Sequence, residues 1–193
     1  MATRLVLVRH GETEWTKSGQ HTGCTDIPLT DRGREDAFRL RDRLQGWTFA
    51  RVLSSPLSRA LETARLAGFG DRVETADELR EWDYGAYEGR TTADIRTRRR
   101  RWSLWLDGTP EGESAADVGA RVDRLLKELR DVDGDVAVFA HGHVLRVLTA
   151  RWLGLSPVEG RLFALAPATI SLLGYERETP VIRLWNSPCA EPA

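Results

Sequence analysis

The sequence has little that would assign it to a membrane, disulfide-rich or nucleic-acid-binding class. Its two cysteines, Cys24 and Cys189, lie far apart and lack metal-ligand spacing, which argues against a disulfide framework or a zinc site. No apolar run approaches the roughly 20 residues that span a bilayer. The formal net charge is only -1, and no signal-peptide pattern precedes the first predicted strand. We therefore expect a cytoplasmic protein without nucleic-acid or membrane partners.

The composition is that of an ordinary globular protein. Hydrophobic residues make up 41% of the 193 residues, which is enough to build one core between layers. Neither an internal repeat nor a linker divides the chain, so we predict a single domain over residues 1–193. The last residues, 187–193, contain two prolines and are predicted to form a poorly ordered tail. Whether the protein is a monomer or a homodimer stays open.

Short apolar segments alternate with stretches of helical periodicity along most of the chain. Strands are predicted at 5–8, 49–53, 73–75 and 135–140, and helices at 30–45, 57–66, 92–106, 114–129 and 144–153. Two further strands, 169–175 and 181–185, are predicted to form a hairpin at one edge. This alternation predicts an α/β fold, a three-layer α/β/α sandwich with a mainly parallel central sheet.

Basic and imidazole side chains follow the two strongest strands directly. Arg9 and His10 end the first strand, His141 follows strand 135–140, and Arg59 lies in the first turn of helix 57–66. Right-handed crossovers bring the carboxyl ends of parallel strands to one edge of the sheet, so we expect these side chains to converge there. Two imidazoles and two guanidinium groups without acidic or thiol ligands at metal spacing favour an oxyanion over a metal ion.

Phosphoryl transfer is the reaction that this set of residues suits best. It needs an in-line nucleophile, cationic or N–H donors for the phosphoryl oxygens, and an acid for the leaving oxygen. His10 can be the nucleophile, and Arg9, Arg59 and His141 the donors. The segment 79–85 is predicted to be a shaped loop that carries the acid, which could be Glu81 or Asp83.

Two other segments are candidates for substrate contacts. The long connection 12–28 carries Trp15, Thr16, His21, Thr22 and Gly23, a mixture suited to holding an anion. The predicted helix 92–106 carries five arginines between positions 96 and 101. Most of that run is expected to be a solvated face, and one or two arginines could reach the crevice to hold a second acidic group.

Four segments together resemble the histidine phosphatase superfamily, in the branch that contains cofactor-dependent phosphoglycerate mutases and related phosphatases. They are Arg9-His10-Gly11-Glu12-Thr13, Ser55-Pro56-Leu57-Ser58-Arg59-Ala60, Glu81-Trp82-Asp83-Tyr84-Gly85 and Phe139-Ala140-His141-Gly142-His143. The resemblance covers nearly the whole chain. It implies a phosphoglycerate mutase-like fold and a reaction that needs neither a metal nor another cofactor.

The same resemblance implies roles for individual residues. His10 would become phosphorylated, Arg9, Arg59 and His141 would hold the phosphoryl group, and Glu81 rather than Asp83 would donate the proton. Substrate contacts are implied for Thr22, Gly23 and Tyr84 and, at the second-histidine motif, for Gly142 and His143. Thr16 occupies the position where many members have Asn. Its hydroxyl can still donate a hydrogen bond to phosphate, but the side chain is shorter and reaches less far.

The sequence favours a phosphatase over a mutase. Phosphoglycerate mutases of this branch carry a proline-rich insertion after the acid loop, and this chain has only a short connection there. A more open crevice would admit water, which would hydrolyse phosphohistidine at position 10. We expect a small phosphorylated metabolite as substrate, a sugar phosphate or glycerate, and the closest likeness is to the bisphosphatases acting on sedoheptulose 1,7-bisphosphate. A cofactor-dependent phosphoglycerate mutase and an inactive phospho-ligand-binding relative are the alternatives.

Overall fold

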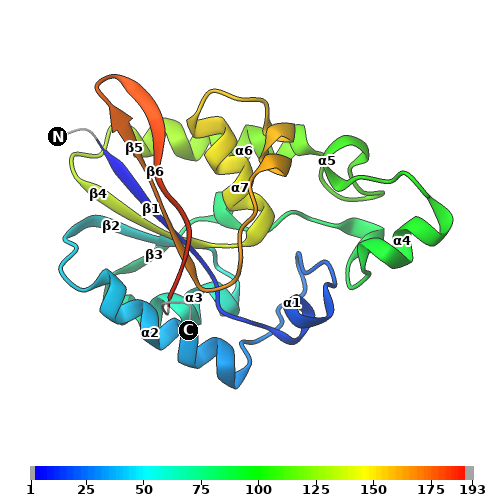
Figure 1. Ribbon diagram of the computed structural model, residues 1–193, viewed down its shortest axis with the longest axis horizontal. Coiled ribbons are helices and arrows are strands. Elements are labelled where there is room, and N and C mark those ends of the chain that lie inside the picture. Colours follow the sequence, from blue (N-terminus) through cyan, green and yellow to red (C-terminus); the bar gives the residue numbers. More distant parts are fainter. Residues whose placement is uncertain (1–2, 190–193) are drawn as a thin grey trace.

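The computed structural model describes residues 3–189 and contains a six-stranded sheet in the order β3-β2-β4-β1-β5-β6 (Figure 1). The strands are β1 (Arg4–Arg9), β2 (Phe49–Ser54), β3 (Val73–Thr75), β4 (Asp135–Ala140), β5 (Thr169–Glu176) and β6 (Thr179–Pro188). The first four run parallel to one another, and β5 pairs antiparallel with both β1 and β6. The predicted mainly parallel sheet with an edge hairpin is therefore confirmed.

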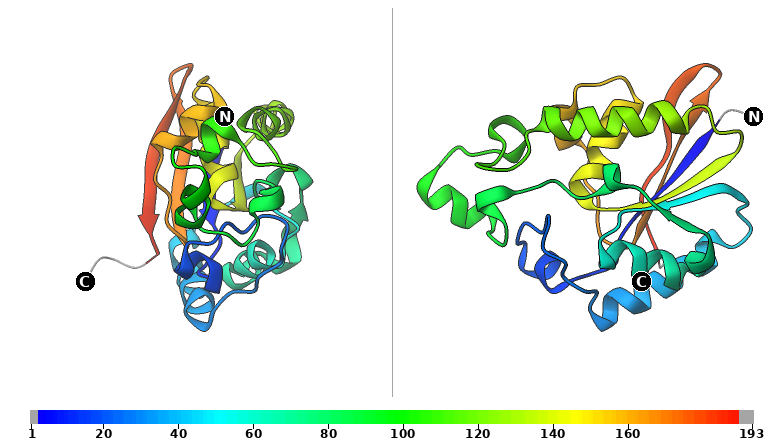
Figure 2. Two further views of the ribbon diagram at one scale, coloured as in Figure 1. Left: turned by 90° about the vertical axis from the view of Figure 1, so that its right-hand side faces the viewer. Right: turned by 180° about the vertical axis from the view of Figure 1, so that it is seen from behind.

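Each face of the sheet is covered by helices, because alternate residues of the central strands are apolar on both sides. In β1, Leu5 and Leu7 pack into one core cluster, and Val6 and Val8 pack into the other. The first cluster lies under α6 (Ala115–Leu129) and α7 (Gly142–Trp152), and the second lies under α2 (Asp31–Leu44) and α3 (Ser58–Ala64). Figures 1 and 2 show these two helical layers on either side of the sheet.

The remaining helical segments are short and lie mostly in the connections. They are α1 (Glu14–Ser18), α4 (Thr92–Arg98), α5 (Leu104–Asp107), η1 (Arg65–Phe69), η2 (Gly70–Arg72), η3 (Asp77–Leu79), η4 (Gly85–Tyr87) and η5 (Pro157–Leu162). The helix predicted to begin at Ser114 does so, and Ser114 and Asp117 form a capping box at its start. The helix predicted from residue 144 begins earlier, at Gly142, so that His141 is its N-cap residue.

Three predictions about local structure are wrong. The single helix 92–106 is two helices, because buried Trp102 lies between them and its indole donates to the Gly108 carbonyl over 2.9 Å. The connection 12–28 contains α1, which a capping box between Thr13 and Thr16 starts. Within the predicted tail, Ser187 and Pro188 belong to β6 and pair with β5, while residues 190–193 lie outside the described part.

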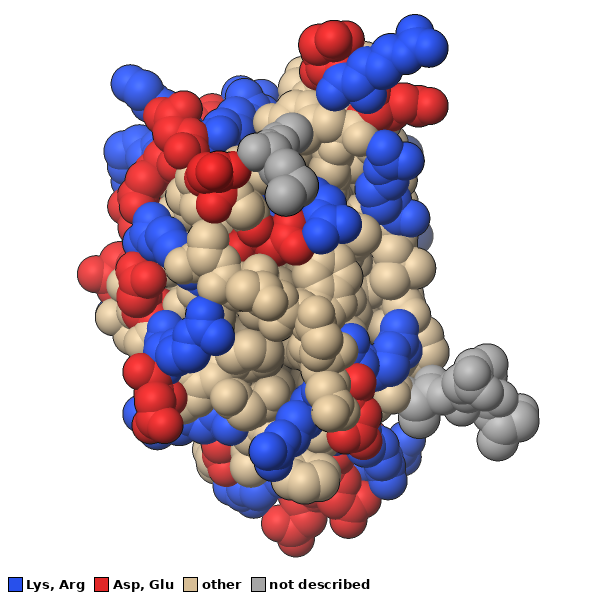
Figure 3. Space-filling model, turned by 90° about the vertical axis from the view of Figure 1, so that its left-hand side faces the viewer, with Lys and Arg blue, Asp and Glu red and all other residues tan. Residues whose placement is uncertain are grey.

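Charged side chains of both signs are interspersed on the face at the amino ends of β1 and β4 (Figure 3). Within residues 3–189, no helix combines the length and the apolar character needed to cross a membrane.

Candidate active site

A cavity of about 250 Å³ opens where β1 and β4 end. Its wall is built by residues from the end of β1, the segment around α1, the acid loop and the start of α7. These include Arg9, His10, Trp15, Thr16, His21, Thr22, Glu81, Tyr84, Thr92, Gly142, His143 and Arg146. Eight of the eleven predicted site residues therefore line one cavity, although they come from segments far apart in the chain.

His10 lies at the inner end of the cavity with one ring nitrogen fixed by the backbone. Its Nδ1 is 2.7 Å from the Gly11 carbonyl oxygen, which can only accept, so we assign the proton to Nδ1 and a free lone pair to Nε2. The side chain is only 3% exposed. Burial, with the charges of Arg59 and Arg9, lowers the pKa of His10 well below its ordinary 6.5. The imidazole is therefore neutral at neutral pH, with the lone pair of Nε2 free.

The turn after His10 requires glycine. A Cβ on Gly11 would lie 2.4 Å from the carbonyl oxygen of Gly33 in α2, closer than any such contact tolerates. This close approach anchors the end of β1 against the start of α2, so the position of the His10 ring is set by backbone packing.

Arg9 supplies a buried cation with an unused donor. Its Nη1 donates to the Leu165 carbonyl, but its buried Nε has no hydrogen-bond partner among residues 3–189. Burial lowers the pKa of the guanidinium. A buried N–H without a partner is costly, and an anion in the cavity would remove that cost. Gly142 lets the start of α7 approach this group, because a Cβ there would lie 3.3 Å from Cζ of Arg9.

Directly behind His10 lies a second buried imidazole, His141, with ring centroids 5.0 Å apart. Arg59 Nε donates to His141 Nδ1 over 3.1 Å, so Nδ1 must accept and Nε2 must carry the proton. That Nε2 lies 2.7 Å from the Ser55 hydroxyl, to which it donates. Burial and the charge of Arg59 lower the pKa of His141 well below 6.5. The predicted convergence of the two histidines is present.

Arg59 and His141 do not line the cavity. The Arg59 guanidinium is fully buried and donates through Nη1 and Nη2 to the carbonyls of Thr22, Gly23 and Thr25 over 3.0–3.1 Å. Gly23 also lies behind the wall. The structure thus brings these three residues next to the site, and their direct contacts with a phosphoryl group stay predictions.

Glu81 is held by backbone N–H groups at the start of α7. Its Oε1 accepts from the amides of Trp82 and Val144 over 2.9 Å, and its Oε2 accepts from the amide of His143 over 3.0 Å. The carboxyl lies in the wall of the same cavity as His10. Asp83, the other candidate acid, accepts from the Gly85 amide and lines a different cavity. The geometry therefore favours Glu81 as the acid.

The other residues predicted to contact substrate line the cavity, and their polar groups already make hydrogen bonds within the protein. The Thr16 hydroxyl donates to the Thr13 carbonyl over 2.8 Å, and the Thr22 hydroxyl donates to Gln20 over 3.2 Å. The Tyr84 hydroxyl and His143 Nδ1 share a hydrogen bond of 2.6 Å. Burial raises the pKa of Tyr84 and lowers that of His143, so both groups are neutral at neutral pH.

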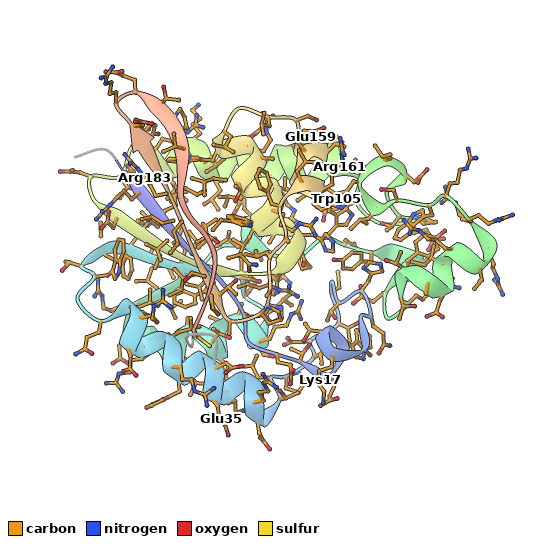
Figure 4. All side chains as sticks on the ribbon, viewed as in Figure 1. Lys17, Glu35, Trp105, Glu159, Arg161 and Arg183 are labelled. Carbon is orange, nitrogen blue, oxygen red and sulfur yellow. The ribbon has the colours of Figure 1, made fainter. Side chains whose placement is uncertain are left out.

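Arg146, which the sequence did not single out, lines the outer part of the cavity. It lies one helical turn after His143 on α7, and this i, i+3 spacing is the signal that could have found it. The guanidinium stacks 4.6 Å over the Trp105 ring, and its Nε donates to the Gly160 carbonyl over 3.1 Å. Figure 4 labels Trp105 on this side of the molecule, near η5.

The arginines between positions 96 and 101 do not reach the cavity. All five are exposed on or after α4, and none lines the wall. The run is therefore the solvated face that was expected for most of it, and the open possibility that one or two of its arginines reach the crevice is not realised. Arg146 is the cation in the outer part of the cavity. Among the described residues, no group of three His, Cys, Asp or Glu side chains is arranged to hold a metal ion.

Known proteins similar to this chain include two phosphatases. An acid phosphatase from Mycobacterium tuberculosis is 42% identical over 193 residues, which cover 96% of this chain and 94% of the relative. A sedoheptulose 1,7-bisphosphatase from Saccharomyces cerevisiae is 37% identical, with 80% of this chain and 69% of the relative covered. A solved structure of a Mycobacterium tuberculosis open reading frame has a TM-score of 0.90 at 38% identity, covering 97% of this chain and 99% of that chain.

These findings confirm the predicted phosphoglycerate mutase-like α/β fold and the prediction of a phosphoric monoester hydrolase. The model of the histidine phosphatase superfamily (branch 1) matches residues 5–188, and the chain belongs to this family.

Proposed function

We propose that the protein is a metal-independent phosphomonoesterase that acts through a phosphohistidine on His10. One observation carries the proposal: a neutral imidazole with Nδ1 fixed on the Gly11 carbonyl lines the same cavity as Arg9, whose buried Nε has no hydrogen-bond partner among residues 3–189. The chain thereby supplies its own nucleophile and its own cation for the phosphoryl group.

In the first step, Nε2 of His10 attacks phosphorus and the bond from phosphorus to the ester oxygen breaks. Glu81, in its acid form, donates a proton to the leaving oxygen, so the product leaves as a neutral alcohol. The ring of His10 becomes positive, and the Gly11 carbonyl stabilises it through the hydrogen bond to Nδ1. Arg9 stabilises the charge on the phosphoryl oxygens.

In the second step, water attacks phosphorus and the P–N bond breaks. The Glu81 carboxylate accepts a proton from that water, which restores its acid form, and His10 returns to the neutral tautomer. Arg59 and His141 take part from behind the wall: the guanidinium adds positive charge, and His141 offers the Nε2 proton that Ser55 accepts in this structure. We propose that this N–H turns to a phosphoryl oxygen when substrate binds.

The outer part of the cavity supports a small substrate with a second acidic group. Arg146 is the cation there, and its Nη1 has no hydrogen-bond partner among the described residues. The neutral hydroxyl and imidazole groups of Tyr84, His143 and Thr92 in the wall suit sugar hydroxyls. We propose phosphorylated sugars or glycerates as substrates, with a sugar bisphosphate such as sedoheptulose 1,7-bisphosphate as the first choice.

The test is a panel of sugar monophosphates, sugar bisphosphates and 3-phosphoglycerate, assayed for free phosphate in the presence of a metal chelator. The expected result is phosphate release that is highest for a bisphosphate and absent in His10→Ala. Isomerised phosphoglycerate without phosphate release would make the protein a mutase. Binding of these compounds without turnover of any would make it an inactive relative.

A further inference from the structure

The loop that contains Gly23 is held from two sides by opposite charges. On one side, Arg59 donates to the carbonyls of Thr22, Gly23 and Thr25. On the other side, Glu88 Oε1 accepts from the amides of Gly23 and Thr25 over 2.9 and 3.0 Å, and Oε2 lies 3.1 Å from the Gly23 amide. Both polar edges of the loop backbone are thereby satisfied, one by a cation and one by an anion.

This arrangement connects Glu88 to the catalytic histidines. The same guanidinium that binds the loop carbonyls donates through Nε to His141 Nδ1 over 3.1 Å. That bond makes Nδ1 the acceptor and places the proton of His141 on Nε2. A shift of the loop would move Arg59, and the tautomer of His141 would lose its support. Glu88 itself does not line the cavity.

The fit between Glu88 and the loop is tight. A Cβ on Gly23 would lie 2.8 Å from Glu88 Oε2 and 2.5 Å from the Trp82 carbonyl oxygen. Glu88 also has no ion pair with Lys or Arg among residues 3–189, and its carboxylate accepts hydrogen bonds from the two loop amides. An unpaired carboxylate near a site for an anionic substrate opposes binding, which makes a role in holding the loop the better explanation for its place.

We propose that Glu88 is a positioning residue for the phosphoryl-transfer reaction. It fixes the loop of residues 22–25, the loop orients Arg59, and Arg59 fixes the tautomer of His141. The kinetic part of this proposal rests on the proposed phosphatase function. The structural part, the tautomer of His141, does not depend on it.

The experiment compares Glu88→Ala and Glu88→Gln with Asp117→Asn. Asp117 is a matched control because its carboxylate also accepts a backbone amide, that of Ser114, at the start of α6 and away from the cavity. Three quantities are measured: kcat and KM on the best substrate of the panel, the unfolding midpoint, and the ¹⁵N signals of the His141 ring.

In Glu88→Ala we expect kcat to fall by roughly 10- to 100-fold with a smaller change in KM, because the displaced groups act on the reacting phosphoryl group. The His141 ring signals should show a second tautomer. Glu88→Gln keeps one amide oxygen as an acceptor and should recover part of kcat and most of the original tautomer. Asp117→Asn should lose stability without changing kcat or the His141 signals.

The proposal is overturned if both Glu88 variants keep kcat within about twofold of the original, an effect too small for a displaced catalytic group. It is also overturned if they lose stability while the His141 signals stay unchanged, since that is a structural role alone. If Glu88→Ala does not fold, Glu88→Gln decides by the same two readouts. A protein that releases no phosphate from any substrate refutes the proposed function, and the His141 signals then still decide on Glu88.

Discussion

The inner and outer parts of the cavity are built in different ways. In the inner part, backbone groups fix the functional side chains: the Gly11 carbonyl holds His10, and three amides hold Glu81. In the outer part, contacts with other segments fix the side chains: Arg146 stacks on Trp105 and donates to the Gly160 carbonyl, and Tyr84 binds His143. The inner geometry therefore follows from the backbone next to each functional residue, whereas the outer geometry depends on the packing of neighbouring segments and side chains.

This difference separates the reaction from the choice of substrate. Loss of the nucleophile or of a group that holds the phosphoryl oxygens should reduce turnover of every phosphate ester to a similar degree, because the phosphoryl group is common to all of them. Loss of the acid Glu81 should depend on how much protonation the leaving group needs, and not on the sugar. Changes in the outer part should alter the ranking of substrates and leave the reaction itself intact. Each prediction below tests one side of this division.

The largest effect is expected for His10→Ala. The variant lacks the nucleophile, so turnover should fall by roughly 10⁴- to 10⁶-fold, the scale of loss when an enzyme nucleophile is removed. The measurement is phosphate release from the best sugar phosphate and from nitrophenyl phosphate, with the unfolding midpoint as the control for folding. A loss on one substrate only would show that His10 is not the nucleophile for both. The inner part of the cavity would then not serve every phosphate ester alike.

The next effect is expected for Glu81→Gln. General acid catalysis contributes about 10²- to 10⁴-fold, and a glutamine cannot donate the proton to the leaving oxygen. Turnover of alkyl phosphates should fall by that amount, whereas nitrophenyl phosphate, whose leaving group needs little protonation, should lose far less. The two substrates are compared in the same preparation. Equal losses on both would show that Glu81 has a different role.

A smaller and selective effect is expected for Arg146→Ala. A hydrogen bond to a charged group contributes about 1.5–3 kcal/mol, so kcat/KM for a sugar bisphosphate should fall by roughly 10- to 100-fold. For the matching monophosphate it should change little. Arg98→Ala on exposed α4 is the control variant, and it should leave both substrates unaffected. A parallel fall on both substrates would assign Arg146 to the reaction and not to substrate choice.

The smallest effect per residue concerns the pH dependence of stability. All four histidines line the cavity or lie directly behind it, and burial lowers their pKa values, that of His21 to about 4. Below pH 6.5, the ordinary pKa of histidine, these residues become protonated in the unfolded chain but stay neutral in the folded chain. Protons therefore stabilise the unfolded state, and the free energy of unfolding falls as the pH falls. Each histidine contributes up to about 1.4 kcal/mol per pH unit in that window.

Denaturant unfolding at pH values from 7.5 to 5 measures this slope. His21→Asn should reduce it by about one histidine's share. A stability that rises as the pH falls through this range would contradict the neutral state assigned to these residues.

The inner part of the cavity could be predicted from the sequence, and the outer part could not. Arg9, His10 and His141 follow the two most apolar strands directly, so the rule for parallel strands places them at one edge. The choice between Glu81 and Asp83 depended on the family resemblance, and the structure adds that only Glu81 shares a cavity with His10. The positions of Arg9, His10 and His141 depend on where the strands end in the sequence, and the apolar pattern predicts those ends.

Arg146 was missed because its i, i+3 spacing from His143, the one signal for it, does not show where the guanidinium points. It belongs to a regular helix, and only the packing of Trp105 and η5 determines where its guanidinium points. The arginines from 96 to 101 drew attention by their number, but α4 ends at Arg98 and all five are exposed. Arg59 was placed correctly at the start of α3, yet its hydrogen bonds to loop carbonyls depend on tertiary contacts that a sequence does not display.

The most direct test of the account is the detection of the covalent intermediate. The protein is mixed with a preferred sugar phosphate, quenched within one turnover under alkaline conditions, and digested for mass spectrometry. The account predicts one acid-labile phosphoryl group on the peptide that contains His10, attached to Nε2, and its accumulation in Glu81→Gln when nitrophenyl phosphate is the substrate. Full turnover without phosphorylation of His10, or a phosphoryl group on another residue, would contradict it.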